Sequence, residues 1–283
     1  MWPTFVPADD INLLNSYSFQ TVKNAFDSIS SSSQIDFKYR QGGCQQRAQL
    51  MSMILQKQFG IQHSKIWLFA PAVLNAGDIR AMFMEDENKL SPFNIVSWNY
   101  HVAPAVLINE NGETNIYVID PSVNSSGPVN MNSWFNSIGN SSLCRYSFHK
   151  PENYFFNCLY NKNSELTTIF DGSFFEYDNP DKDNLIMEKG LAANDTAMAV
   201  YYKYILPLMD AENEPDKLKL EGLKAIFGNA AALDMLFCQN TSGYEYNTTH
   251  RYVITCYSDI ILDAKAIFNR QLVFWTRYVN GLL

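Results

Sequence analysis

Residues 41–60, "QGGCQQRAQLMSMILQKQFG", constrain the fold most strongly. Apolar residues recur within them at the spacing of one helical face: Ala48, Met51, Ile54 and Leu55. Gly43 can supply the bend that enters a helix, and Gly60 suits the end of one. The pattern therefore predicts a helix from about Cys44 to Gln58, with a cysteine at its first position.

Three downstream segments are typical of strands: residues 63–74, 98–108 and 114–122. The dipeptide Asn111-Gly112 favours a tight hairpin between the last two. Pro104 cannot donate to a strand ladder, so we expect its strand to lie at a sheet edge or to be locally irregular. Residues 75–94 have little periodicity and are interpreted as a loop or an insertion.

The character of the chain changes after about residue 150. Residues 170–184 are polar and indicate a connector, and helical patterns follow from about residue 185. The last segment carries a single apolar stripe at helical spacing, made of Val253, Tyr257, Ile260, Ala264, Ile267, Leu272, Trp275 and Val279. We therefore expect an α+β catalytic domain over residues 1–150. A helical domain over residues 185–283 would serve substrate recognition or targeting.

Composition argues against several classes of protein. The chain has 29 acidic and 21 basic residues, a net charge of −8, and no Lys or Arg run, so we expect no nucleic-acid partner. The longest apolar stretch, residues 66–74, is too short to span a bilayer. The first ten residues lack the basic and apolar regions of a signal peptide. Either the chain is not exported by the general route or a leader has been removed.

Metal and cofactor chemistry is not indicated either. The five cysteines and four histidines match no zinc-binding spacing. We therefore expect no metal and no cofactor. Cys144, Cys158, Cys238 and Cys256 have no setting comparable to that of Cys44 and are interpreted as structural.

The expected hairpin brings a histidine and an aspartate onto one face of the sheet. With a two-residue turn at Asn111-Gly112, the numbers of opposite residues sum to 223, so His101 faces Ser122 and Asp120 lies diagonally. A turn centred one residue earlier would place His101 and Asp120 directly opposite each other. A shift of that sum by one residue, as from a bulge, would separate them onto opposite faces.

Cys44, His101 and Asp120 together suggest nucleophilic catalysis. A helix N-terminus and a nearby imidazolium both favour a thiolate, and a carboxylate can orient the imidazole. Gly43 lets a substrate approach the backbone, and the Cys44 N–H could help bind an oxyanion. Trp98 and Tyr100 could form the wall of an acyl site. The alternative is that all of them pack structurally: a small buried thiol, a core histidine, a turn-forming aspartate and aromatic sheet residues.

Four short segments resemble the protein-glutaminase (protein-deamidating) family. They are "GCQQRAQLM", "WNYHVAPAVLI", "YVIDPS" and "GPVNMNSWF", in this order over about residues 41–135. The resemblance implies a transglutaminase- or papain-like α+β core, in which a helix with an N-terminal cysteine packs on an antiparallel sheet. It also implies Cys44 as the nucleophile, His101 as the general base and acid, and Asp120 as the residue that orients the imidazole. The helical half beyond residue 185 has no counterpart in it.

The expected function is hydrolytic deamidation of a glutamine or asparagine side chain in a protein substrate through a thioester. Transglutamination and cysteine proteolysis use the same three groups and stay open. A non-catalytic protein-interaction module is the alternative from another class. Such an enzyme would suit a secreted effector or toxin, with delivery into a host cell left open. The oligomeric state is open as well.

Overall fold

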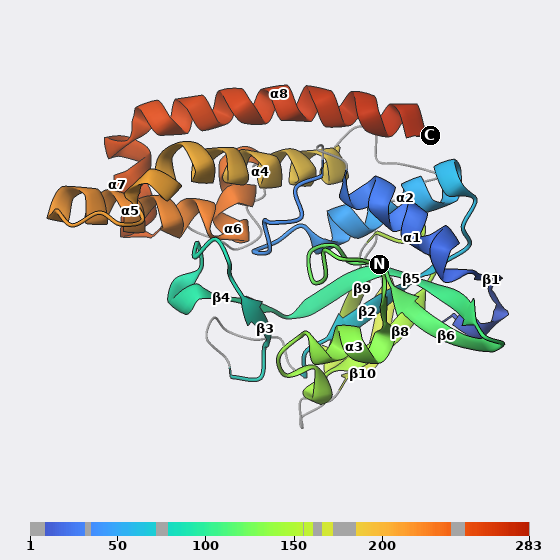
Figure 1. Cartoon of the computed structure of the whole chain (residues 1–283). Coiled ribbons are helices and arrows are strands. Elements are labelled where there is room, and N and C mark those ends of the chain that lie inside the picture. The colour runs from blue at the N-terminus through green and yellow to red at the C-terminus, as the bar shows by residue number, and fades with distance from the viewer. Residues whose placement is uncertain are drawn as a thin grey trace.

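The protein is described by a computed structural model over residues 9–31, 35–71, 79–154, 156–160, 166–171, 185–238 and 247–282. It is an α+β structure, as the sequence predicts. A twisted sheet lies below a layer that contains helices α1 (Phe19–Ser30) and α2 (Cys44–Phe59), and the long C-terminal helix runs above them (Figure 1).

The main sheet has six strands and is antiparallel except for one short edge pairing. Its order is β7-β6-β5-β2-β8, and β1 pairs parallel with β5. The strands are β1 (Ser16–Tyr17), β2 (Ser64–Phe69), β5 (Tyr100–Glu110), β6 (Glu113–Val118), β7 (Val129–Asn130) and β8 (Arg145–His149). The predicted strand 63–74 thus begins as expected, and its residues 72–74 lie outside the described residues.

Two further hairpins and several short helices complete the first half. They are β3 (Met82–Glu85) with β4 (Ile95–Trp98), β9 (Phe156–Tyr160) with β10 (Leu166–Asp171), α3 (Met131–Asn136), and the 3₁₀ turns η1 (Ile11–Leu13), η2 (Pro92–Asn94) and η3 (Ser141–Leu143). Residues 75–94, predicted to be a loop or an insertion, contain β3, so the loop interpretation is wrong for residues 82–85. The strands of this hairpin have four residues each, which is too short for a clear period-two pattern. Residues 172–184 of the predicted connector lie outside the described residues.

The β5–β6 hairpin has the predicted register. Glu110 pairs with Glu113 and Ala105 with Val118, so the numbers of paired residues sum to 223. Asn111 and Gly112 both have positive φ, 55° and 87°, as a two-residue hairpin turn of the I′ type requires.

Of the two alternatives predicted for the strand of Pro104, the sheet edge is wrong, because β5 lies between β6 and β2 in the sheet. The β5–β6 ladder ends at Ala105, and the Pro104 carbonyl accepts a hydrogen bond from Ile119 N at 2.9 Å just beyond it. Pro104 pairs with Lys65 of β2, and its missing N–H would face the β6 side, as its carbonyl does, just beyond the end of the β5–β6 ladder. The predicted strand 98–108 is also interrupted, since Trp98 ends β4 and β5 begins at Tyr100.

Helix α2 is one residue longer than predicted and is framed by the two glycines. Gly43 precedes it with φ 81°, and Gly60 follows it with φ 63°. Its buried positions run continuously from Gln46 to Leu55, so the helix is covered on all sides in its first three turns. One side packs on β5, and other sides meet α1, α4 and α8.

The C-terminal part of the chain is helical from residue 186, as predicted. It contains α4 (Ile186–Val200), η4 (Tyr201–Ile205), η5 (Leu206–Leu208), α5 (Glu214–Phe227), α6 (Ala230–Leu233), η6 (Asp234–Cys238), α7 (Thr248–Cys256) and α8 (Ser258–Leu282), hereafter the helical half. Helix α8 lies along α4 (Figure 1). Within the described residues, none of the helices is both long and apolar enough to cross a bilayer.

The predicted C-terminal stripe packs into the protein's own core. Trp275 and Val279 are buried, and they belong to a cluster that also holds Phe26 of α1 and Leu50 of α2. A second cluster lies within the first half of the chain. It includes Ile66 and Leu68 of β2 and Trp134 of α3. The larger core is therefore shared by both halves of the chain. The division into domains 1–150 and 185–283 stays a prediction.

Candidate active site

Cys44 is the first residue of α2 and is buried, with 8% of its surface exposed. Because Gly43 has no side chain, no side-chain cap covers the first N–H groups of the helix. The thiol therefore belongs to the first turn at the positive end of the helix. The Sγ atom donates a long hydrogen bond of 3.5 Å to Gln45 Oε1.

His101 and Asp120 form a buried pair, as the hairpin register predicts. His101 Nε2 donates to Asp120 Oδ2 at 2.7 Å, and the two residues are 1% and 3% exposed. Burial disfavours the imidazolium, but Asp120 and the Cys44 side chain outweigh it and raise the pKa of His101 to about 9. At neutral pH the ring is thus positively charged and can supply a proton.

Asp120 accepts four hydrogen bonds, one of them from Ser122 N to its Oδ1 at 3.2 Å. Its Oδ2 accepts from His101 and from Trp134 Nε1 at 2.9 Å, and its Oδ1 accepts from Ser122 Oγ at 2.5 Å. Burial opposes ionisation of this carboxyl, but His101 and the hydrogen bonds from Ser122 and Trp134 lower its pKa to about 2. The carboxylate therefore stays ionised and can orient the imidazole and stabilise its charge.

Two aromatic rings sandwich the imidazole. Trp98 stacks on His101 with a centroid distance of 4.8 Å and an interplanar angle of 18°, and Trp134 stacks at 5.7 Å and 26°. Trp98 is itself fixed, because its Nε1 donates to Arg40 O at 2.8 Å. These contacts restrict rotation of the ring. Nδ1 makes no hydrogen bond of ordinary geometry with the described residues, so it is available to the thiol and the substrate.

A cavity of about 250 Å³ opens beside the thiol. Gly43, Cys44, Trp98 and Tyr100, four of the six residues singled out from the sequence, line it. His101 adjoins it through its contacts with Cys44 and Trp98, and Asp120 is hydrogen-bonded to His101. The six predicted residues therefore come together in one place, and their individual roles stay predictions.

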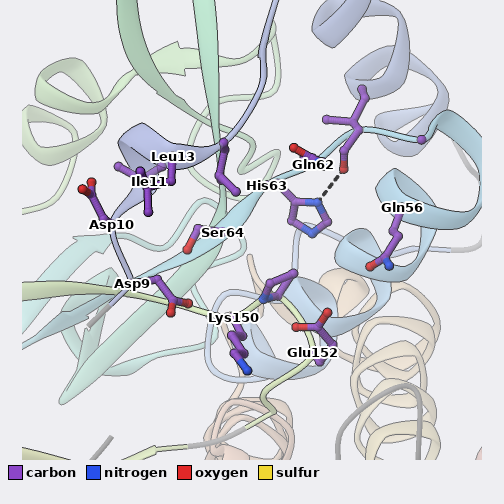
Figure 2. A pocket seen from close by; sticks show the side chains of 14 residues that line it. Asp9, Asp10, Ile11, Leu13, Gln56, Gln62, His63, Ser64, Lys150 and Glu152 are labelled. Carbon is purple, nitrogen blue, oxygen red and sulfur yellow. Dashed lines mark hydrogen bonds between the residues drawn. The ribbon is translucent and has the colours of Figure 1, made fainter. Parts of the chain in front are cut away.

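A larger cavity, of about 660 Å³, lies elsewhere and contains none of these six residues among the described residues that line it. Asp10, Gln56, His63 and Glu152 are among its lining residues (Figure 2). His63 Nδ1 contacts Ile61 O at 2.9 Å, and burial lowers the pKa of this histidine to about 4. Among the described residues that line this cavity, Ser64 alone carries a hydroxyl or thiol nucleophile, and its Oγ donates to His149 O. Size alone therefore does not identify the site of chemistry.

Three residues that support the site, Trp134, Ser122 and Arg47, were not among the predicted site residues. Trp134 and Ser122 lie within the quoted segments "GPVNMNSWF" and "YVIDPS", but their hydrogen bonds to Asp120 depend on the tertiary structure. Arg47 follows Cys44 by three residues and so shares its helical face. It is 3% exposed and donates to Tyr39 O at 3.0 Å. Burial lowers its pKa, while the charges of Cys44 and Asp120 raise it, so Arg47 is a buried cation near the nucleophile.

The helical half supplies further residues of the same cavity, which no local pattern in the sequence indicated. They include Asn194 of α4 and Asp234 at the start of η6. Burial raises the pKa of Asp234 to about 6. Within the described residues, no group of three or more His, Cys, Asp or Glu side chains could hold a metal ion.

Selective alkylation tests the reactivity of the thiol. We expect limiting iodoacetamide at neutral pH to modify Cys44 first, because the helix terminus and the imidazolium stabilise its thiolate. Burial raises the pKa of Cys144 and of Cys238 to about 12, so these react slowly, and the exposed Cys256 is the main competitor. Peptide mapping by mass spectrometry measures the order. Labelling of Cys256 before Cys44, or a Cys44 rate that His101→Ala leaves unchanged, would count against an activated thiol.

Comparisons with known proteins give one family match and several similar solved structures. Residues 18–138 match a protein-family model described as glutaminase. Among solved structures, the chain is similar to the NMR structure of protein-glutaminase from Chryseobacterium proteolyticum, with 26% identity and a TM-score of 0.41 over 53% of this chain and 82% of that one. The chain is also similar to a crystal structure of protein-glutaminase, with 27% identity and a TM-score of 0.40. That match covers 52% of this chain and 81% of the other. A crystal structure of pro-protein-glutaminase is similar as well, with 25% identity and a TM-score of 0.41. That match covers 59% of this chain and 57% of the other.

No curated protein matches the sequence significantly. The matched range 18–138 contains Cys44, His101, Asp120 and Trp134, so it covers the whole nucleophile–imidazole–carboxylate arrangement and leaves out the helical half. The resemblance to the protein-glutaminase family is therefore confirmed by the match of residues 18–138, which are less than half of the chain.

Proposed function

We propose that this protein deamidates glutamine side chains of a protein substrate, with Cys44, His101 and Asp120 as its catalytic residues. The observation that carries the proposal is the thiol at the uncapped N-terminus of α2 beside an imidazole that Asp120 holds at 2.7 Å. This set of groups suits acyl transfer at an amide carbon. The family match over residues 18–138 supports glutamine as the side chain attacked.

The first half of the reaction releases ammonia. The Cys44 thiolate attacks the carboxamide carbon, a C–S bond forms, and the carbonyl oxygen becomes an oxyanion. His101, charged because its pKa is raised to about 9, passes its proton to the nitrogen. The C–N bond then breaks, ammonia leaves, and a thioester of Cys44 remains.

The second half consumes water. Neutral His101 takes a proton from a water molecule, whose oxygen attacks the thioester carbon. The C–S bond breaks, and the product is a glutamate side chain with a free Cys44 thiolate and an imidazolium. Asp120 stays ionised throughout, because its pKa lies near 2, and it holds the ring in one orientation.

Intact-mass analysis tests the reaction directly. Incubation with a glutamine-rich protein should add about one dalton per modified residue. The thioester forms with loss of NH₂, and water then hydrolyses it, so that OH replaces NH₂ in the side chain. Ammonia should appear in equal amount, and an asparagine-containing analogue should show which amide is preferred. Added methylamine distinguishes transglutamination, which would incorporate the amine. Chain fragments would indicate proteolysis, and neither mass change nor ammonia with any substrate would refute the proposal.

The biological setting is a separate expectation. Secretion, action as an effector or toxin and delivery into a host cell stay predictions, with which the family match is compatible. A tagged chain expressed in its own host, followed in cells and in culture supernatant, tests the first of them. Retention of the tagged chain inside the cells would contradict secretion.

A further inference from the structure

The helical half forms one wall of the cavity that contains the nucleophile. Gly190, Ala193 and Asn194 come from α4, and Ala230, Leu233 and Asp234 from α6 and η6. The contact is tight: a Cβ atom on Gly42 would lie 2.7 Å from Ala230 Cβ, and one on Gly190 would lie 2.4 Å from Gln46 Nε2. The start of α2 and the helical half therefore meet at van der Waals distance beside Cys44.

Asn194 brings a hydrogen-bond donor to this wall. It is 7% exposed, and its Nδ2 is buried without a hydrogen-bond partner among the described residues. A Cβ atom on Gly43 would lie 1.9 Å from Nδ2, so the amide nitrogen rests against the residue that precedes the nucleophile. A buried amide N–H without an acceptor is unfavourable unless a ligand supplies one.

The backbone provides a second donor at the same place. Cys44 is the first residue of α2, and Gly43 offers no side chain to cap the N–H groups of the first turn. The oxygen of a carbonyl whose carbon Cys44 attacks would lie near the Cys44 N–H, where the helix terminus stabilises negative charge. Cys44, the first residue of the uncapped helix, and Asn194 both line the 250 Å³ cavity.

We propose that Asn194 is a catalytic residue whose Nδ2 donates, together with the Cys44 N–H, to the substrate carbonyl oxygen as it becomes an oxyanion. The proposal rests on the proposed function, since it concerns the same attack by Cys44. It places one donor on the glutaminase-like region and the other on the helical half. The helical half then takes part in the bond chemistry and not only in the choice of substrate.

Two reactions of Cys44 separate this role from a structural one. Acylation by p-nitrophenyl acetate passes through an oxyanion: a C–S bond forms, the ester C–O bond breaks, and p-nitrophenolate leaves. Methyl methanethiosulfonate instead forms an S–S bond and releases a sulfinate, with no carbonyl addition. An oxyanion donor accelerates the first reaction alone, whereas a residue that only positions Cys44 affects both. The Cys44→Ala variant gives the background of both assays.

Replacing Asn194 is therefore expected to have a selective effect. In Asn194→Ala, acylation and ammonia release from glutamine should fall about 10²-fold through kcat, while the methanethiosulfonate rate stays within about twofold. Asn194→Leu, which keeps the approximate volume, should show the same selectivity without a lower Tm, because it removes an unpartnered buried donor. Asn269→Ala, an exposed asparagine of α8 in the same half, should behave as the unchanged protein.

Several outcomes would overturn the proposal. Acylation that is unchanged in both Asn194 variants would show that Nδ2 does not contact the oxyanion. A parallel loss of acylation and methanethiosulfonate reactivity would show that Asn194 only positions the nucleophile. If the unchanged protein releases no ammonia from glutamine substrates, the proposed function fails. The p-nitrophenyl acetate comparison still decides the role of Asn194, because it needs no glutamine.

Discussion

Replacing Cys44 with alanine should lower ammonia release on the order of 10⁶-fold, and His101→Ala should cost a similar factor. The thiol is the atom that bonds to substrate, and the imidazole moves the proton at both steps, so neither half of the reaction proceeds without them. Asp120→Asn should cost less, on the order of 10⁴-fold, since it leaves the nucleophile and the ring in place. Initial rates of ammonia release measure all three.

The double variant Cys44→Ala/His101→Ala tests whether the two residues act as a unit. It should be little slower than either single variant, because removing the second member of a unit removes nothing further. Cys144→Ala is a matched control: this thiol is partly buried and lies outside the cavity, and it should retain full activity. Circular dichroism must show that each variant is folded. Losses that multiply would contradict a shared step.

The local part of this site was predictable from the sequence because short-range rules determine it. Gly43 and Gly60 mark the ends of α2, so Cys44 could be assigned to the first helical position. The Asn111-Gly112 turn fixes the hairpin register, which in turn brings His101 and Asp120 to one face. Each inference used contacts close in sequence or a turn whose geometry has few alternatives.

The remaining parts depend on tertiary contacts that no local pattern encodes. Trp134 donates a hydrogen bond to Asp120 only because α3 packs beside β6 and β7. Asn194 meets Gly43 only because α4 packs on α2. Pro104 misled the prediction for a related reason. Whether a proline interrupts a ladder depends on where the neighbouring strand ends, and β6 ends one pair before it. The residue type alone therefore does not predict whether a proline interrupts strand pairing, because the answer depends on the neighbouring strands.

The second large effect concerns stability: a chain that ends after residue 150 should not fold. The larger core joins α1, α2 and β5 to the helical half, and α2 is buried continuously from Gln46 to Leu55. Truncation would expose the apolar side chains of α2 that now face α4 and α8. Each such side chain contributes about 1.5–3 kcal/mol when buried, whereas a domain is stable by only about 5–15 kcal/mol in total. A few newly exposed residues therefore suffice to unfold the fragment.

Point variants in the full chain separate core packing from an effect of chain length. Trp275→Ala should lower the free energy of unfolding by about 3–5 kcal/mol, because Trp275 is fully buried and its Nε1 donates to Asp195 Oδ2 at 2.6 Å. Val273→Ala, two residues away and exposed, should change it by less than about 0.5 kcal/mol. Thermal and urea melts followed by circular dichroism measure both.

A fragment 1–150 that melts cooperatively and still releases ammonia would mean that the first half has a sufficient core of its own. In that case the helical half could be neither part of the folding unit nor the source of an essential oxyanion donor.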